Sequence, residues 1–561
     1  MTTDLGGPDQ VVRKACEQLH KQPGALCYLD HGDSGVDETR GTATSGATDP
    51  ERRGAAWRRV TVAALTVAVA TVALRAFNPY TGTAPHIDSG VYLGAAEHLL
   101  HGRVLYREVW DHKPPVVHTI DALVLSFGDH TVNSVRSIER WWAALAAAAV
   151  LAIGLLAFEN VALASVASLL FVMHFYHPNV MRGNQPEEYG SILTLVAILL
   201  CLASAAYRRW SLASAAASGL FFAVACLTKE TFALGAIPWL PFLAWQTYRR
   251  RTSWLRTVCW FGAGFAVPFA AFFGYLLWNG ALGDWLDTLR FNLSYIRFDA
   301  RNEPNPGLLA SLLRGFTRGN ELVFAVSRAT AVGAVLGAAS AAFGEFRRRT
   351  RGLPLVLLLF FVLNLVGVSL ARRYGYYFLQ LVSGYVLLAA CGLAFLLFLA
   401  RGRRTLQAGI FAVFVGALLT ADGHEAARFV RTLAQPRAIF HGDDEVVAFI
   451  RANTTPSDPI WNLVREGSAV YAHADRLSPT RFFYIAANLF RDLPDPQGAK
   501  REIREALTVR PPKIIVFDGD EAWLAKADLV EWFRNNYAPT RVARVFLRRP
   551  STASGEPSRL K

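Results

Sequence analysis

Two polar motifs lie close together near the start of the chain, at the edges of long apolar stretches. The first runs from His86 to Tyr92 and contains Asp88, and the second runs from Trp110 to Pro115 and contains Lys113. A carboxylate such as Asp88 can take up a proton, and a lysine can meet a phosphate as a point charge. The prolines after Lys113 push its backbone into an extended conformation. The two motifs therefore predict a general base and a phosphate-binding cation in one region.

Simpler roles for both residues stay open. A helix over residues 91–101 would place an apolar face along a membrane surface, and Asp88 would then be no more than its N-terminal cap. Lys113 could extend its ammonium group to lipid headgroups instead of a substrate.

Three short turns between later apolar stretches also carry charges. Glu187 and Glu188 stand at the mouth of an apolar segment, where they could act in chemistry or simply be solvated. Arg372 and Arg373 suit an anionic lipid phosphate, although anchoring to headgroups beside aromatic side chains would also explain them. The adjacent pair Lys229-Glu230 is expected to neutralise itself.

The histidines of the first polar region are poorly spaced for a metal site. They lack a compact pattern, such as two histidines on one helical face with a third nearby. The six histidines of this region are His86, His98, His101, His112, His118 and His130. None of the six cysteines has a metal-type spacing either. A divalent cation held by the acidic groups of the polar loops stays open as a cofactor.

The composition indicates that much of the chain lies in a lipid bilayer. Of 561 residues, 52% are hydrophobic and 18% are charged, and the apolar residues come in blocks long enough to cross a bilayer. The pattern predicts an α-helical polytopic membrane protein with about eleven spans. These lie at 60–77, 141–157, 160–178, 189–206, 211–228, 231–247, 257–279, 321–343, 353–371, 376–400 and 405–421.

Arginine placement predicts the orientation. Arginines cluster before the first span and in alternate loops, so the positive-inside rule places the N-terminus in the cytoplasm. The loop 78–140, the other polar turns named above and the C-terminus then share the outer face. Most of the +14 net charge is this arginine bias, so we do not expect a nucleic-acid partner.

The ends of the chain differ from its middle. Residues 1–56 and 551–561 are predicted to be disordered tails, and 57–421 to form the membrane domain. Residues 422–550 change to alternating helix and strand patterns, with strands at 460–464 and 513–517. They predict a small α/β domain on the outer face.

Together these motifs resemble the first outer loop of the GT-C glycosyltransferases, in the branch of the protein O-mannosyltransferases and the lipid A aminoarabinose transferase. The resemblance rests on Asp-Ser-Gly-x-Tyr at 88–92, Leu-x-x-Gly-x-x-Leu-Tyr at 99–106 and Trp-Asp-x-Lys-Pro-Pro at 110–115. The tyrosines at 374–377 and the C-terminal domain extend it.

The resemblance implies an activity and a division of roles. Members of the family move a sugar from a polyprenyl-phosphate donor to an acceptor on the outer face, with inversion at the anomeric carbon. By position, Asp88 matches the catalytic acid and Lys113 the lysine that faces the donor phosphate. Ser89 follows where many relatives have a glutamate, so Asp111 or Glu187 could supply a second carboxylate.

We therefore expect a hexosyl- or pentosyltransferase of a bacterial inner membrane, acting on a cell-envelope acceptor. The expected site residues are Asp88 and Glu187 for catalysis, Lys113, Arg372 and Arg373 for the donor phosphate, and Asp111, Glu188, Tyr92 and Tyr376 in support. A transporter or lipid flippase and a non-catalytic membrane scaffold are the alternative classes. The odd number of spans and the lack of a half repeat argue against a transporter.

Overall fold

The computed structural model describes residues 50–76, 87–298, 303–420, 423–434, 444–464, 467–485 and 489–550. The chain divides into two compact units, Met1–Arg58 and Arg59–Lys561, and the second contains most of the described residues. His86, most of the predicted N-terminal tail and the predicted C-terminal tail lie outside the described residues.

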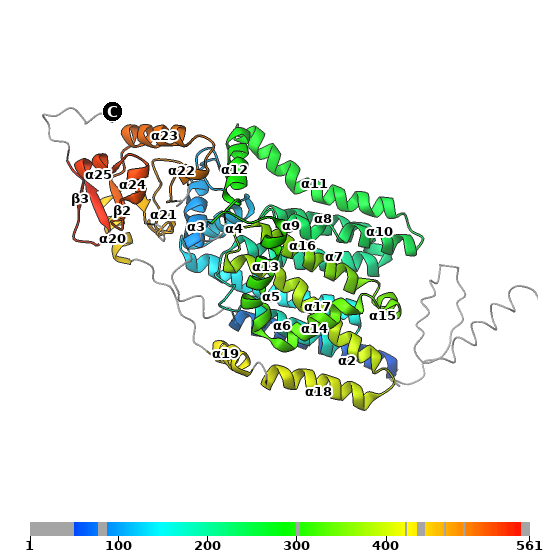
Figure 1. The fold of residues 1–561 in the computed structure, drawn as a ribbon. Helices are drawn as coiled ribbons and strands as arrows, with labels where there is room; N and C mark the ends of the chain where they lie inside the picture. Colours follow the sequence, from blue (N-terminus) through cyan, green and yellow to red (C-terminus); the bar gives the residue numbers. More distant parts are fainter. Residues whose placement is uncertain are drawn as a thin grey trace, which may run out of the picture. The chain divides into compact units, whose positions relative to one another are not determined.

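Long apolar helices make up most of the second unit (Figure 1). Within the described residues, six are long and apolar enough to cross a membrane, or up to eight if each of two bent pairs counts as one span. The six are α5 (Val132–Phe158), α7 (Pro186–Ala206), η2 with α8 (Arg208–Trp210 and Ser211–Cys226), α11 (Trp254–Trp278), α16 (Leu353–Leu370) and η4 with α17 (Gly375–Phe378 and Leu379–Leu399). The prediction of a helical, multi-span membrane protein is confirmed.

The number of long spans is smaller than the eleven apolar blocks of the sequence. Some blocks form shorter helices, such as α6 (Val161–Phe175), and the block at 231–247 is divided by Pro238 into α9 (Phe232–Ala236) and α10 (Trp239–Arg249). Proline interrupts a helix because it has no backbone N–H to donate. Hydropathy reports burial in an apolar medium, but not whether one helix runs through the whole block.

The remaining apolar blocks form two bent pairs of helices and part of helix α2. Helix α13 and η3 (Leu308–Leu322 and Phe324–Val326) meet α14 (Arg328–Ser340) at 118°. Helix α18 (Arg404–Thr420) meets α19 (Gly423–Ala434) at 76°, and the first predicted span falls in α2 (Pro50–Ala76).

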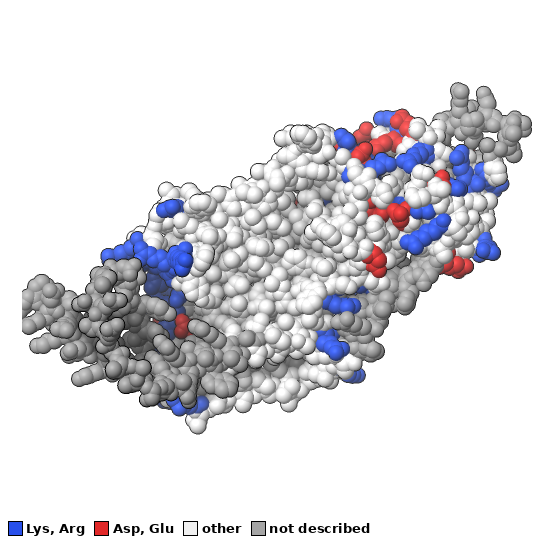
Figure 2. Space-filling model, turned by 180° about the vertical axis from the view of Figure 1, so that it is seen from behind, with Lys and Arg blue, Asp and Glu red and all other residues white. Residues whose placement is uncertain are grey.

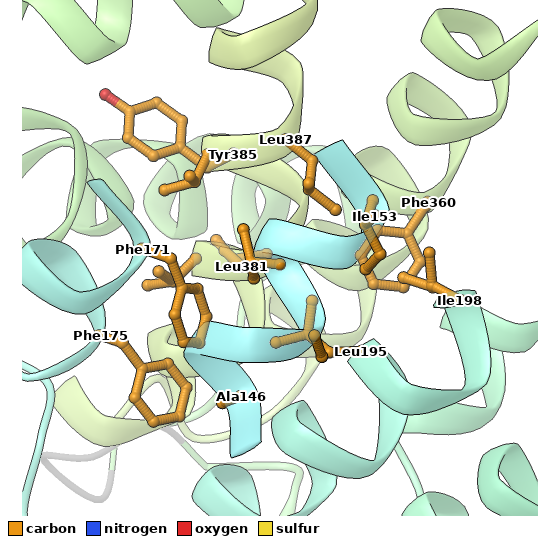
Figure 3. Close-up of a cluster of buried hydrophobic side chains, with 14 of the residues drawn as sticks. Ala146, Ile153, Phe171, Phe175, Leu195, Ile198, Phe360, Leu381, Tyr385 and Leu387 are labelled. Atoms are coloured by element: carbon orange, nitrogen blue, oxygen red, sulfur yellow. The ribbon is translucent and has the colours of Figure 1, made fainter. Parts of the chain in front are cut away.

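Small residues allow the helices to approach closely. Gly219 on α8 faces the main chain of α11 at Phe261, and Gly264 on α11 faces the main chain of α8 at Ala216, so a side chain at either position would clash. The core beside them is formed by α5, α6, α7, α16 and α17, whose aliphatic and aromatic side chains interdigitate in Figure 3. Figure 2 shows charged side chains near two ends of one face, with a broad uncharged belt between them, as expected for a surface in contact with lipid.

The C-terminal residues form the predicted α/β domain. Its sheet has the order β1-β2-β4-β3, formed by β1 (Ile460–Leu463), β2 (Ile514–Phe517), β4 (Val545–Arg548) and β3 (Tyr537–Pro539). Strands β1 and β2 are parallel with Ile460 opposite Ile514, and the other neighbours are antiparallel. Its helices are α20 (Asp444–Asn453), α21 (Val470–Ala474), α22 (Leu489–Asp492), α23 (Pro496–Val509), α24 (Ala522–Lys526) and α25 (Val530–Asn536).

Helix α3 (Ile87–Leu100) lies between the membrane helices and the C-terminal domain, and its N-terminal turn carries Asp88 as predicted. It does not lie on a surface, because residues 89–98 are buried and α21 of the C-terminal domain packs on it. Gly90 and Gly94 face the backbone of residues 468 and 469, where a Cβ at Gly94 would meet Ser468 O at 2.8 Å. His98 completes the junction by accepting a hydrogen bond from the backbone N–H of Ser478 (2.9 Å).

Three further helices of the unit are shorter. They are α4 (Val116–Phe127), α12 (Leu282–Tyr295) and α15 (Gly344–Arg349).

Candidate active site

Asp88 and Tyr376 join the first polar motif to the start of a late span. Tyr376 lies on η4, and its hydroxyl donates a hydrogen bond of 2.7 Å to Asp88 Oδ2. Its ring stacks parallel to that of Tyr374, with centroids 5.7 Å apart, and lies edge-on to Tyr377. A packed aromatic cluster therefore fixes the hydroxyl that orients the carboxylate.

Two lysines meet at the ring of Tyr377. Lys113 is 9% exposed, and its Nζ lies 5.7 Å from the ring centroid. Lys229, from the turn before α9, lies over the same ring. The main-chain oxygen of Lys113 accepts a hydrogen bond from the Tyr106 hydroxyl (3.1 Å), which fixes the turn ahead of the two prolines. The tyrosine turn thus brings Asp88, Lys113 and Lys229 together.

Glu187 and Glu188 separate, although they are neighbours in sequence. Glu187 forms an ion pair with Lys229, and its second oxygen accepts no hydrogen bond from the described residues. Glu188 instead lies beside Glu139, away from this ion pair. Both are fully buried, so the interpretation that they are solvated is wrong. Lys229 forms its ion pair with Glu187 and not, as expected, with Glu230, which accepts a hydrogen bond from Asn292 (3.3 Å).

Asp111 is held in a buried network beside Lys113. His118 Nε2 lies 2.6 Å from Asp111 Oδ2, and the hydroxyl of Tyr484 donates to Oδ1 (3.1 Å). Tyr484 belongs to the C-terminal domain. Tyr92 packs edge-on against His118, with ring centroids 5.5 Å apart. Both carboxylate oxygens of Asp111 are engaged, so this geometry favours a structural role for it.

Burial and neighbouring charges set the proton affinities of this region. Burial raises the pKa of Asp111, but hydrogen bonds from His112 and His118 outweigh it and hold the pKa well below its usual range. Burial lowers the pKa of Lys113, but Tyr377, Tyr295, Glu187 and Asp88 more than offset this and raise it, so Lys113 stays charged. Burial lowers the pKa of Lys229 to about 8, against the pull of Glu187.

Arg372 and Arg373 follow α16 and line a cleft of about 660 Å³ together with Arg314 and Arg318 from α13. The guanidinium of Arg372 stacks 3.8 Å from the ring centroid of Tyr295 and donates to its carbonyl oxygen (3.1 Å). That group also donates to the hydroxyl of Tyr374 (3.2 Å), so Arg372 is linked to the tyrosine turn. Arg373 donates to Ser369 O (3.1 Å).

A divalent cation needs several ligands that converge. Among the described residues, the one group of three His, Cys, Asp or Glu side chains with converging ligand atoms is Glu97, His101 and Asp475, which includes neither Asp88 nor Glu187. A catalytic cation at the tyrosine turn stays a prediction.

Some residues of the site could not be selected from sequence spacing. Lys229 was expected to pair with its neighbour, and Tyr377 was only part of a tyrosine-rich turn. Tyr484 stands in Phe482-Phe483-Tyr484, which gave no sign of contact with Asp111. The composition of the 374–377 turn was the one available signal, since three of its four residues are tyrosines.

Comparison with known proteins identifies the architecture. A model of the dolichyl-phosphate-mannose-protein mannosyltransferase family matches residues 112–286. The structure of ArnT from Cupriavidus metallidurans bound to undecaprenyl phosphate superposes with a TM-score of 0.52 at 14% identity, covering 88% of this chain and 99% of that one. The archaeal oligosaccharyltransferase AglB from Archaeoglobus fulgidus, in complex with an inhibitory peptide and a dolichol-phosphate, gives 0.50 at 13% identity, covering 90% and 75%. A comparison with curated protein sequences finds no match.

The fold and the family match define the class: a multi-span membrane protein with the GT-C architecture. Residues 112–286 match the protein mannosyltransferase family and the fold is that of ArnT and AglB, in agreement with the resemblance drawn from the motifs.

Proposed function

We propose that this protein transfers a hexosyl or pentosyl group from a polyprenyl-phosphate donor to a cell-envelope acceptor, with inversion at the anomeric carbon. The observation that carries the proposal is the meeting of Asp88, Lys113 and the Glu187–Lys229 pair at the tyrosine turn. These residues come from four separate segments. Lipid phosphates in the ArnT and AglB structures support a donor of this kind.

In this proposal Asp88 is the general base. The acceptor hydroxyl oxygen forms a bond to the anomeric carbon as the bond from that carbon to the phosphate oxygen breaks. The hydroxyl becomes acidic as the new bond forms, and Asp88 takes the proton late in the step. Tyr376 holds the carboxylate in one orientation for this transfer. The glycosylated acceptor and the polyprenyl phosphate leave as products.

Lys113 stabilises the leaving phosphate, whose negative charge grows in the transition state. A preorganised cation in a buried site stabilises that charge more strongly than it would in water. Arg372 and Arg373, beside the same tyrosines, extend the positive surface toward the cleft. Glu187, with one oxygen free of hydrogen bonds, is a second carboxylate in reach of the acceptor side. Glu188 interacts with Glu139 and is given no part in this step.

We also propose the orientation in which the N-terminus is cytoplasmic and the tyrosine turn and C-terminal domain face outward. The basis is the arginine bias of the alternate loops. The membrane would be the bacterial inner membrane.

The test uses membranes from cells with and without this chain, supplied with radiolabelled prenyl-phosphate hexose and pentose. The proposal expects chain-dependent movement of the labelled sugar into envelope material, with release of unlabelled prenyl phosphate. Movement of the intact labelled lipid between leaflets without sugar transfer would instead support a flippase. Absence of both activities across the donor set would contradict the proposal.

A further inference from the structure

Four polar side chains gather where the end of α3 meets the C-terminal domain. Glu97 lies in the last turn of α3, His101 follows one helical turn later, and Asp475 ends α21. His101 Nε2 lies 3.5 Å from Asp475 Oδ1, and Glu97 Oε1 lies 3.4 Å from the other ring nitrogen of His101, Nδ1. The fourth side chain, His130, comes from the turn before α5, and its Nδ1 lies 2.8 Å from Glu97 Oε2.

The hydrogen bonds leave lone pairs directed into this cluster. His101 Nδ1 lies 3.0 Å from the main-chain oxygen of Glu97, which selects the tautomer with hydrogen on Nδ1 and a lone pair on Nε2. His130 occupies one oxygen of Glu97, while the other, Oε1, accepts no hydrogen bond from the described residues. Glu97 is 0% exposed. A buried carboxylate oxygen whose nearest nitrogen lies 3.4 Å away is only weakly stabilised, and a bound cation would stabilise it further.

The three candidate ligand atoms lie within 4.8 Å of one another, and one separation matches that expected around a tetrahedral metal ion. Zinc binds histidine nitrogen and carboxylate oxygen at about 2.0–2.2 Å, which places neighbouring ligand atoms about 3.3–3.6 Å apart. The observed separation of 3.5 Å between His101 and Asp475 lies in this range. A histidine among the ligands favours zinc over calcium or magnesium, which prefer oxygen.

We propose that Glu97, His101 and Asp475 bind a structural zinc ion, with His130 orienting Glu97 from outside the coordination shell. His101 and Asp475 are 38% and 46% exposed, so the ion has access from solvent and a water can complete the tetrahedron. The ion would join α3, which carries Asp88 at its other end, to the C-terminal domain. The proposal does not depend on the transfer reaction.

The test measures zinc binding by the full-length, tag-free protein in detergent, with zinc alone as the probe. Elemental analysis after dialysis should give one zinc per chain. A competing chelator dye should show that His101→Ala and Asp475→Asn each weaken zinc binding more than 100-fold, and that His130→Ala weakens it about 10- to 100-fold. The control is His424→Ala, an 82% exposed histidine beside Glu425, which should bind zinc as the unchanged protein does.

Thermal stability gives a second measurement that separates metal loss from misfolding. Zinc should raise the melting temperature of the unchanged protein and of His424→Ala, but not of His101→Ala, because a ligand stabilises only a fold that binds it. Without zinc, His101→Ala should have the same melting temperature as the metal-free unchanged protein. Equal zinc affinity or an equal zinc-induced shift in the unchanged and His101→Ala proteins would overturn the proposal.

Discussion

Replacing Tyr376 by phenylalanine removes one hydroxyl from the candidate active site and little else. The ring would keep its stacking on Tyr374 and its edge contact with Tyr377. What is lost is the 2.7 Å hydrogen bond to Asp88 Oδ2. Because the acceptor is a carboxylate, such a bond contributes about 1.5–3 kcal/mol. If the bond orients the base in the transition state, transfer slows about 10- to 150-fold, since each 1.36 kcal/mol is tenfold in rate.

The assay is the initial rate of labelled sugar transfer, measured over a range of donor concentrations. We expect the loss in kcat, with little change in the donor KM, because Tyr376 acts through Asp88 and not on the donor phosphate. The matched control is Tyr385→Phe, a tyrosine further along α17 whose hydroxyl donates a longer hydrogen bond, of 3.5 Å, to Ser327 O. A Tyr376→Phe rate within twofold of the unchanged protein would refute the positioning role.

Three further predictions concern the lysines. Lys113→Met should weaken binding of polyprenyl phosphate about 10- to 100-fold, because it removes a charge-assisted contact. The control is Lys526→Met, which changes an exposed lysine of α24 and should leave lipid binding unchanged. Native mass spectrometry of the lipid complex measures both variants. Glu187→Gln and Lys229→Gln should each cost about 3–5 kcal/mol of stability by leaving a buried charge unpaired, and the double variant should recover part of it; additive losses in melting experiments would contradict the pairing. Since the pKa of Lys229 is about 8, its charge is lost as pH rises through that value; transfer should decline there in the unchanged protein, and Lys229→Arg should move the decline to higher pH. A decline at the same pH in both would show that another group titrates.

The sequence predicted what depends on local pattern. Apolar blocks marked the membrane helices, and short apolar runs marked the strands at 460–464 and 513–517, of which the second is rich in β-branched residues. The sequence placed Asp88 at the N-terminus of a helix, and it lies in the first turn of α3. Span number was less certain, because a proline or a sharp bend breaks a block without changing its hydropathy.

The pairings within the site depend on packing between distant segments. Glu187 forms its ion pair with Lys229, 42 residues away in the sequence, and not with a neighbour in its own turn. Tyr484 reaches Asp111 only because the C-terminal domain docks on α3 through Gly90 and Gly94. The histidines of the first polar region showed no metal spacing for the same reason, since Asp475 completes the cluster from the other end of the chain.

The most direct test of the central claim is single-turnover transfer by purified Asp88→Asn protein. Asparagine keeps the shape of the side chain and can still accept a hydrogen bond from Tyr376, so only the basic carboxylate is lost. The control is Asp287→Asn, an exposed aspartate on α12 that pairs with Arg290. We predict that Asp88→Asn lowers the rate of sugar transfer from a prenyl-phosphate donor by at least about 100-fold while Asp287→Asn leaves it unchanged. Transfer by Asp88→Asn at the rate of the unchanged protein would contradict the assignment of Asp88 as the base.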